Sequence, residues 1–261
     1  MLNVFLLVFS FLFGMVFGSF ANVCIYRVPE KKSLWFPPSA CLACGYRLRW
    51  HDNIPLVSYL MLGGKCRSCK TGISFQYPLI EMLTGFLFAL IYLNFGFTLD
   101  TLFVFLIATV LVVIAGIDYK TMIIPNGTVL SLIIIGALYS VARLVLPGMF
   151  ISEISIWDPV IGFFAASIPL YLIAVISKGG MGGGDIKLMA AAGLFLGWKG
   201  VLLAMFLGSI TGAVVSLVLI AFRIRKRKDL IPFGPFLCLG ILTAANYAPG
   251  MIAWYLGLFS L

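Results

Sequence analysis

The sequence predicts an all-α, polytopic helical membrane protein with about eight transmembrane helices. Of its 261 residues, 62% are hydrophobic and only 10% are charged, whereas a soluble domain has roughly 25% charged residues. Apolar stretches recur at the length that a helix needs to cross the bilayer core, about 20 residues. They are continuous and do not alternate apolar and polar positions as the strands of a membrane barrel do. A water-soluble globular protein is therefore excluded.

The first predicted span covers residues 1–21. It is expected to be retained, because no basic residue precedes it and no small-residue cleavage site follows it. A polar segment, residues 22–77, comes next and contains eight of the 18 Lys and Arg residues. Because basic residues collect in cytoplasmic loops, we expect this segment in the cytoplasm and the N-terminus outside.

Residues 78–261 are predicted to form the transmembrane core. Its apolar stretches are 79–96, 101–117, 128–146, 159–177, 186–197, 201–222 and 233–258. Alternate crossings place the basic cluster at residues 223–228 on the inside. The net charge of +9 is therefore interpreted as a signal of topology. Membrane lipid is the expected surrounding partner, and no nucleic-acid binding is predicted.

Four cysteines in the polar segment form two C-x-x-C pairs, Cys41 with Cys44 and Cys66 with Cys69. Their spacing is close to that of a zinc ribbon, in which two tight turns bring four thiolates into a tetrahedron. A polar segment of this size has little apolar core, so a structural zinc ion would supply stability. A redox dithiol and unrelated free cysteines are the alternatives.

Two acidic residues lie at span ends on the predicted cytoplasmic side. Asp118 ends the stretch 101–117, and Asp185 follows five glycines within residues 179–184. An ionisable group in a membrane helix is costly, so it is usually functional or satisfied by a local partner. The structural interpretation makes Asp185 a helix N-cap and Asp118 a partner of Lys120. The glycines favour function, because they let a neighbour or an extended substrate approach the backbone closely.

Two carboxylates within hydrogen-bond distance share one proton, because both cannot ionise together. Such a pair contains a base and an acid at once and can activate water for attack on a peptide carbonyl. It also suits a proton-coupled transporter, in which a carboxylate binds and releases H⁺ and the cysteine segment is a zinc-ribbon regulatory loop. From these residues alone, both functions remain open.

Further motifs accompany the cysteines and aspartates along nearly the whole chain: GSFANV at 18–23, YRVP at 26–29, DNIPLVS at 52–58, YPLIE at 77–81, GID at 116–118 with IPN at 124–126, and GGGDIK at 182–187. Together they resemble the prepilin peptidases, also called type IV leader peptidases, which are multi-pass aspartic proteases of the inner membrane. Leu42 is a departure, because relatives often have proline there. A C-x-x-C turn does not require that proline, so only its fine geometry is affected.

This resemblance implies that Asp118 and Asp185 form a catalytic dyad. The substrates implied are type IV prepilins and pseudopilins, whose basic leader is cleaved after a glycine on the cytoplasmic side. Members with the cysteine region also methylate the new N-terminal residue, usually phenylalanine, with S-adenosylmethionine. No motif identifies the residues that bind this methyl donor. Polar candidates at span ends, which can equally be helix caps or interface anchors, are Ser19, Asn22, Arg27 and Glu81.

Overall fold

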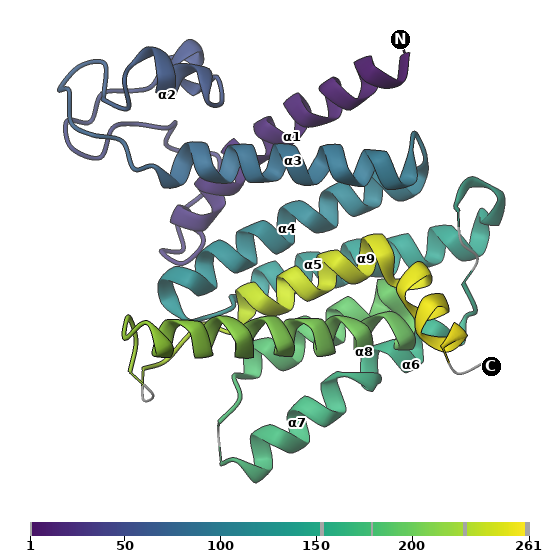
Figure 1. The fold of residues 1–261 in the computed structure, drawn as a ribbon. Helices are drawn as coiled ribbons and strands as arrows, with labels where there is room; N and C mark the ends of the chain where they lie inside the picture. Colours follow the sequence, from purple (N-terminus) through teal and green to yellow (C-terminus); the bar gives the residue numbers. More distant parts are fainter. Residues whose placement is uncertain (1, 152–153, 179, 227–228, 259–261) are drawn as a thin grey trace. The chain divides into compact units, whose positions relative to one another are not determined.

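The computed structural model describes residues 2–151, 154–178, 180–226 and 229–258. Within these ranges the chain is mainly helical, and the extended pairing consists of two isolated antiparallel bridges. The all-α class predicted from the sequence is therefore confirmed. The chain divides into two compact units, Met1–Phe97 and Thr98–Leu261, and each is described by itself (Figure 1).

The first unit consists of two long helices and the polar segment between them. α1 (Leu2–Arg27) packs along α3 (Gln76–Phe95), and the intervening segment contains η1 (Trp50–Asn53) and α2 (Val57–Met61). Glycines allow the long helices to touch: a Cβ atom on Gly14 would lie 2.7 Å from the backbone oxygen of Thr84, and one on Gly18 would lie 2.7 Å from Cα of Glu81.

The second unit is a helical bundle in which α8 is central. Its helices are α4 (Leu99–Thr121), α5 (Asn126–Val145), η2 (Pro147–Met149), α6 (Trp157–Ala165), α7 (Ser167–Ile176), α8 (Gly183–Ala221) and α9 (Gly234–Gly257). α8 packs against α5, α6, α7 and α9, and α4 packs against α5 and α9. At the start of α4, the buried carboxylate of Asp100 accepts hydrogen bonds from Tyr139 and from the backbone of Ile151.

α8 is interrupted at Gly197, whose φ of 68° and ψ of 177° are not helical. A straight helix of its 39 residues would be about 58 Å long, roughly twice the bilayer core. After the break, the second half of α8 runs antiparallel to α9. Gly208 packs on Leu237, and Gly212 packs on the side chain of Phe233, the residue just before α9.

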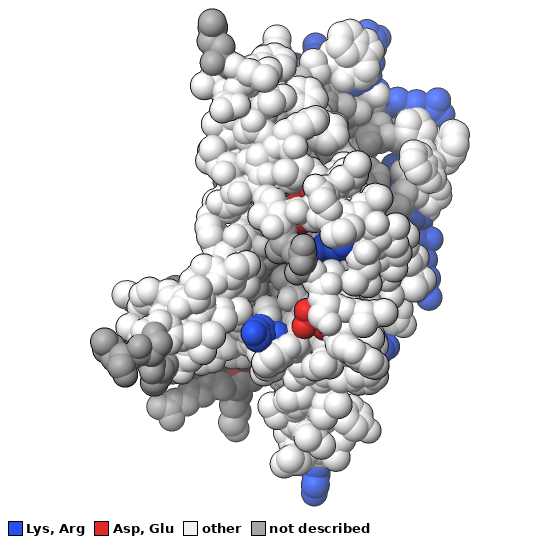
Figure 2. All heavy atoms as spheres, turned by 90° about the vertical axis from the view of Figure 1, so that its right-hand side faces the viewer, with Lys and Arg blue, Asp and Glu red and all other residues white. Residues whose placement is uncertain are grey.

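The helix count agrees with the predicted number of about eight. Seven helices in the described residues, with α6 and α7 counted as one, are long and apolar enough to cross a membrane. The predicted stretches 186–197 and 201–222 are the two halves of α8 on either side of Gly197. The face in Figure 2 is largely uncharged, and apolar side chains such as Phe5, Leu93 and Leu217 are exposed on the helices. These helices fit a multi-pass membrane protein.

Replacing Gly193 with a larger residue tests the tight contact between α6 and α8. A Cβ atom there would lie 2.0 Å from the backbone oxygen of Gly162. We predict that Gly193→Val lowers the free energy of unfolding by about 3 kcal/mol, because the backbones must separate. Gly127→Ala is the control, since a Cβ atom at Gly127 meets nothing within 4 Å. Thermal unfolding in detergent measures both, and equal transition temperatures would contradict the prediction.

Candidate active site and metal centre

Asp118 lies in the last turn of α4 and is only 5% exposed. Its Oδ2 atom accepts a 2.9 Å hydrogen bond from the backbone N–H of Gly234, the first residue of α9. The positive end of the α9 dipole therefore points at this carboxylate and favours negative charge on it. A backbone donor holds the carboxylate at a fixed position.

Asp185 lies in the first turn of α8 and is 9% exposed. The helix N-cap is Gly182 and not Asp185, so the N-cap interpretation of this aspartate is wrong. Its carboxylate instead accepts a hydrogen bond from the backbone of Gly182. Asp185 is therefore held as the third residue of a helix that starts in the glycine run.

The second unit brings the two aspartates together, close enough for a direct electrostatic interaction. Cys238 of α9 is buried within electrostatic range of both carboxylates. Among the described residues, neither aspartate forms an ion pair: Lys120 is exposed, and Nζ of Lys187 donates to Oδ1 of Asn126 at 3.0 Å. The interpretation of Asp118 as a partner of Lys120 is therefore not supported.

Glycines surround the two carboxylates where a side chain would collide. A Cβ atom on Gly234 would lie 2.6 Å from Oδ2 of Asp118, and one on Gly182 would lie 2.9 Å from Oδ2 of Asp185. A Cβ atom on Gly184 would lie 2.9 Å from Cβ of Ile124. Close approach therefore explains Gly182 and Gly184 in the glycine run. Residue 179 of that run lies outside the described residues.

Such a pair can perform acid–base chemistry on a bound water. Two buried carboxylates that lie close together ionise together only at high cost, so a state with one of them ionised and the other protonated is favoured. The ionised member can then act as a base and the protonated member as an acid. Proton uptake and release, as a transporter needs, are equally within its chemistry.

The four predicted cysteines lie together in the first unit. Their Sγ atoms are all within 4.8 Å of one another, and those of Cys41 and Cys69 are 3.8 Å apart. A tetrahedron with Zn–S bonds of about 2.3 Å has edges of about 3.8 Å. The donor set and its spacing therefore fit a closed, four-thiolate zinc site.

The two C-x-x-C turns have the same backbone form. Each is flanked by an isolated bridge, Ala40 with Arg47 and Lys65 with Gly72. In each turn the residue after the second cysteine has a positive φ, 71° at Gly45 and 60° at Lys70. The N–H of that residue donates to the carbonyl of the first cysteine, at 2.9 Å in one turn and 3.1 Å in the other.

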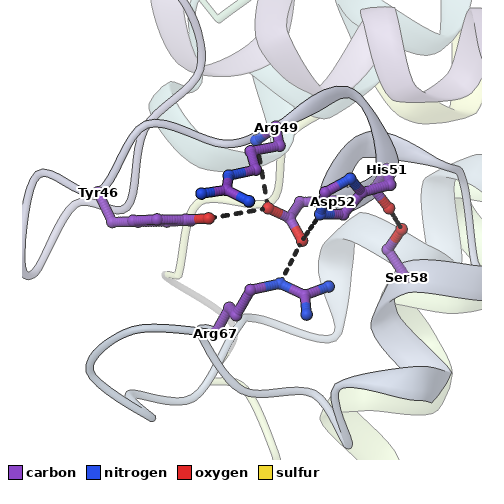
Figure 3. A network of polar contacts seen from close by, with 6 residues as sticks. All are labelled: Tyr46, Arg49, His51, Asp52, Ser58 and Arg67. Atoms are coloured by element: carbon purple, nitrogen blue, oxygen red, sulfur yellow. Dashed lines mark hydrogen bonds and ion pairs between the residues drawn. The ribbon is translucent and has the colours of Figure 1, made fainter.

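A polar network centred on Asp52 joins the two turns (Figure 3). The Asp52 side chain, only 1% exposed, accepts from Nε of Arg67 at 2.8 Å and from the backbone N–H of Arg49 at 3.2 Å. The hydroxyl of Tyr46 donates to it at 3.4 Å. Arg67 belongs to the second turn and Tyr46 follows the first, so Asp52 fixes their relative positions.

Hydrogen bonding sets the ionisation of groups around the cysteines. Burial acts to raise the pKa of Asp52, but the bonds from Arg67 and the Arg49 backbone outweigh it and lower the pKa. The stabilisation from this carboxylate is therefore present above its unfolded pKa and is lost as the pH falls through its lowered folded pKa. Hydrogen bonds with Thr71 lower the pKa of Cys69 to about 6, which favours the thiolate that a metal binds.

Three residues of these sites have roles that the sequence did not reveal. Gly234 and Cys238 contact or approach the aspartates from α9, and Asp52 joins the cysteine turns. Gly234 is followed by proline, a residue typical of the first turn of a helix. That pattern predicts where α9 starts but not that this start faces Asp118.

Comparisons with known proteins match both units. Residues 12–95 match the model described as "Bacterial Peptidase A24 N-terminal domain", and residues 105–217 match "Type IV leader peptidase family". Proteins named "Prepilin leader peptidase/N-methyltransferase" are similar over most of both chains. Identity is 32% in Aeromonas salmonicida (94% of this chain, 92% of the relative), 31% in Legionella pneumophila (94% and 93%) and 34% in Bacillus subtilis (94% and 96%). No solved structure matches.

The Asp52 network predicts the effect of Asp52→Asn on metal binding. An amide cannot form the ion pair with Arg67, so the two turns are held less firmly, and we expect about a tenfold loss of zinc affinity. Competition with a chromogenic chelator measures it. Glu30→Gln is the control, because Glu30 is an exposed carboxylate of the same unit that pairs with Lys32. Unchanged affinity in Asp52→Asn would show that the network does not support the cysteines.

Proposed function

Because this chain belongs to the type IV leader peptidase family, we propose that it is an aspartyl endopeptidase of the inner membrane. It cleaves the basic leader of prepilins and pseudopilins after a glycine, and it N-methylates the new N-terminal residue with S-adenosylmethionine. The observation that carries the peptidase activity is the pair of buried carboxylates, Asp118 and Asp185, at helix ends of the second unit. Neither carboxylate has a basic partner among the described residues.

In this proposal the two carboxylates hold one water molecule between them. The ionised aspartate removes a proton from the water as it attacks the scissile carbonyl, and the protonated aspartate donates a proton to the carbonyl oxygen. The N–H of Gly234 stabilises charge on Asp118 and fixes its position. Fixed carboxylates lower the barrier because no group has to be reoriented during the attack.

The substrate reaches this pair from the side. The apolar segment that follows the leader lies in the bilayer beside the enzyme, which presents the scissile bond near the ends of the membrane helices. The basic residues of the chain favour an orientation with the N-terminus outside and with residues 22–77 and both aspartates facing the cytoplasm. A basic leader is then cleaved on the side where it is made.

The cysteines take a structural role in this proposal. Cys41, Cys44, Cys66 and Cys69 hold one zinc ion, and four thiolates leave no open position for chemistry at the metal. The zinc orders residues 22–77, which belong to the methyltransferase part, while residues 78–261 form the peptidase core and residues 1–21 the first span. No finding favours the proton-coupled transporter.

Replacing the aspartates tests the peptidase activity. Asp118→Asn and Asp185→Asn each remove one carboxylate and should reduce cleavage of a pilin-like precursor by at least about 10³-fold, because neither partner alone supplies both acid and base. Mass spectrometry of the products measures cleavage. Asp229→Asn, at an exposed aspartate of the same unit, is the control. Processing by both variants at the control rate would reject the dyad.

Gly234→Ala tests the positioning of Asp118. The added methyl group would lie 2.6 Å from Oδ2 of Asp118, so the carboxylate or α9 must move away. A misplacement of about 1 Å is expected to lower kcat by about 100-fold. Gly250→Ala is the control in the same helix, since a Cβ atom there meets nothing within 4 Å. Equal kcat values for the two variants would show that the contact with Gly234 does not position Asp118.

A further inference from the structure

Two buried acceptor side chains lie on the contact between α1 and α3 in the first unit. Asn22 of α1 is 3% exposed and Glu81 of α3 is 7% exposed. The two helices touch at Gly18 and Glu81. One turn further along, Nδ2 of Asn22 donates to the carbonyl of Tyr77 at 3.1 Å. The two acceptors are therefore about one helical turn apart on the same contact surface.

Neither acceptor has the partner that burial requires. Oδ1 of Asn22 is buried and has no hydrogen-bond donor among the residues that the structure describes. Glu81 accepts only from neutral donors, the N–H of Leu56 at 2.8 Å and the side chain of Ser19, and among the described residues no basic side chain pairs with it. Arg27 donates instead to the carbonyls of residues 33, 34 and 37.

Such an arrangement is costly unless a cation or a donor binds there. A buried carboxylate without a charged partner and a buried amide oxygen without a donor each destabilise the fold, and native structures usually satisfy such groups. A hard metal ion such as Ca²⁺ takes about six to eight oxygen ligands, more than these two side chains offer. An ammonium group fits better, because it has a positive charge and three N–H donors.

We propose that Glu81 and Asn22 bind the free α-amino group of the cleaved substrate, in its ammonium form. This inference rests on the proposed N-methylation, which acts on that nitrogen. Both residues are about five positions from a helix end, roughly 7 Å into the helix. In this proposal the apolar segment of the cleaved substrate lies in the bilayer and places its N-terminus at this level of α1 and α3.

The backbone of Leu56 contacts Glu81, and in this proposal it moves when the amine enters. Its N–H bonds Glu81 and its backbone, with φ of 60° and ψ of −47° at the start of α2, has a conformation that a leucine rarely adopts. Local strain of this kind is found at ligand clamps. An entering ammonium group replaces the Leu56 N–H as the donor to Glu81 and allows that backbone to relax.

The first test compares two peptides on the zinc-loaded chain in detergent. Both begin with phenylalanine, continue with apolar residues and carry a C-terminal fluorophore; one has a free amino group and the other is N-acetylated. At pH 7, where the α-amino group is mostly protonated, fluorescence polarisation should show the free amine bound about tenfold more tightly. Equal binding of the two peptides to the wild-type chain would overturn the proposal.

The variant Glu81→Gln removes the charge but retains an oxygen for the bonds from Leu56 and Ser19. We expect it to bind both peptides within about twofold of each other, while Glu30→Gln keeps the preference of the wild type. The zinc content of Glu81→Gln reports whether its polar segment is folded. A zinc-loaded Glu81→Gln chain that keeps the tenfold preference would contradict the inference.

Cross-linking tests the contact in the wild-type chain and does not depend on any variant. A carbodiimide condenses a carboxylate and an amine to an amide with loss of water, and mass spectrometry should locate the peptide amine on Glu81. Coupling only to other carboxylates would reject the site. These tests need neither cleavage nor methyl transfer. A chain that shows the Glu81-dependent preference but does not methylate would therefore refute the proposed function and leave the amine site standing.

Discussion

The hydrogen bond from the N–H of Gly234 to Asp118 is the contact on which the site of the second unit depends. It requires α9 to start directly against the end of α4, which only a residue without a side chain allows. Other close contacts made by glycines follow the same rule, since Gly193 and Gly208 let α8 pack against α6 and α9. Because lipid offers no hydrophobic drive between helices, small residues at such contacts are how membrane helices associate closely.

The polar segment of the first unit is organised by polar contacts instead. Its cysteine turns are small and poor in apolar residues, so their order depends on the four thiols and on the carboxylate of Asp52. Glu81 links this polar segment to the membrane helices through Leu56. The buried acidic groups thus differ in role. Asp52 has a cationic partner, and Asp100 accepts hydrogen bonds from Tyr139 and Ile151 within the bundle. Asp118, Asp185 and Glu81 have no cationic partner among the described residues, and we assign them to chemistry or binding.

Sequence reasoning predicted the helical class, the approximate number of spans and the cysteine cluster, because long apolar stretches and paired cysteines each have one main physical explanation. The catalytic role of Asp118 and Asp185 came from the family resemblance and stays a prediction. The break in α8 was visible only as a short stretch, 186–197, since glycine alone does not indicate whether a helix turns back. The roles of Gly234 and Cys238 could not be predicted, because they depend on α9 packing against α4, a contact between residues far apart in the chain. The N-cap interpretation of Asp185 was wrong because Gly182 starts the helix.

In the proposed peptidase mechanism, Asp118 and Asp185 act on one water molecule. The most direct measurement is an experimental structure of the chain with a substrate peptide in which a secondary alcohol replaces the scissile amide. We expect the alcohol oxygen, which stands in for the attacking water, to lie within hydrogen-bond distance of both carboxylates. An alcohol that contacts only one aspartate, or that binds away from the ends of α4 and α8, would contradict it.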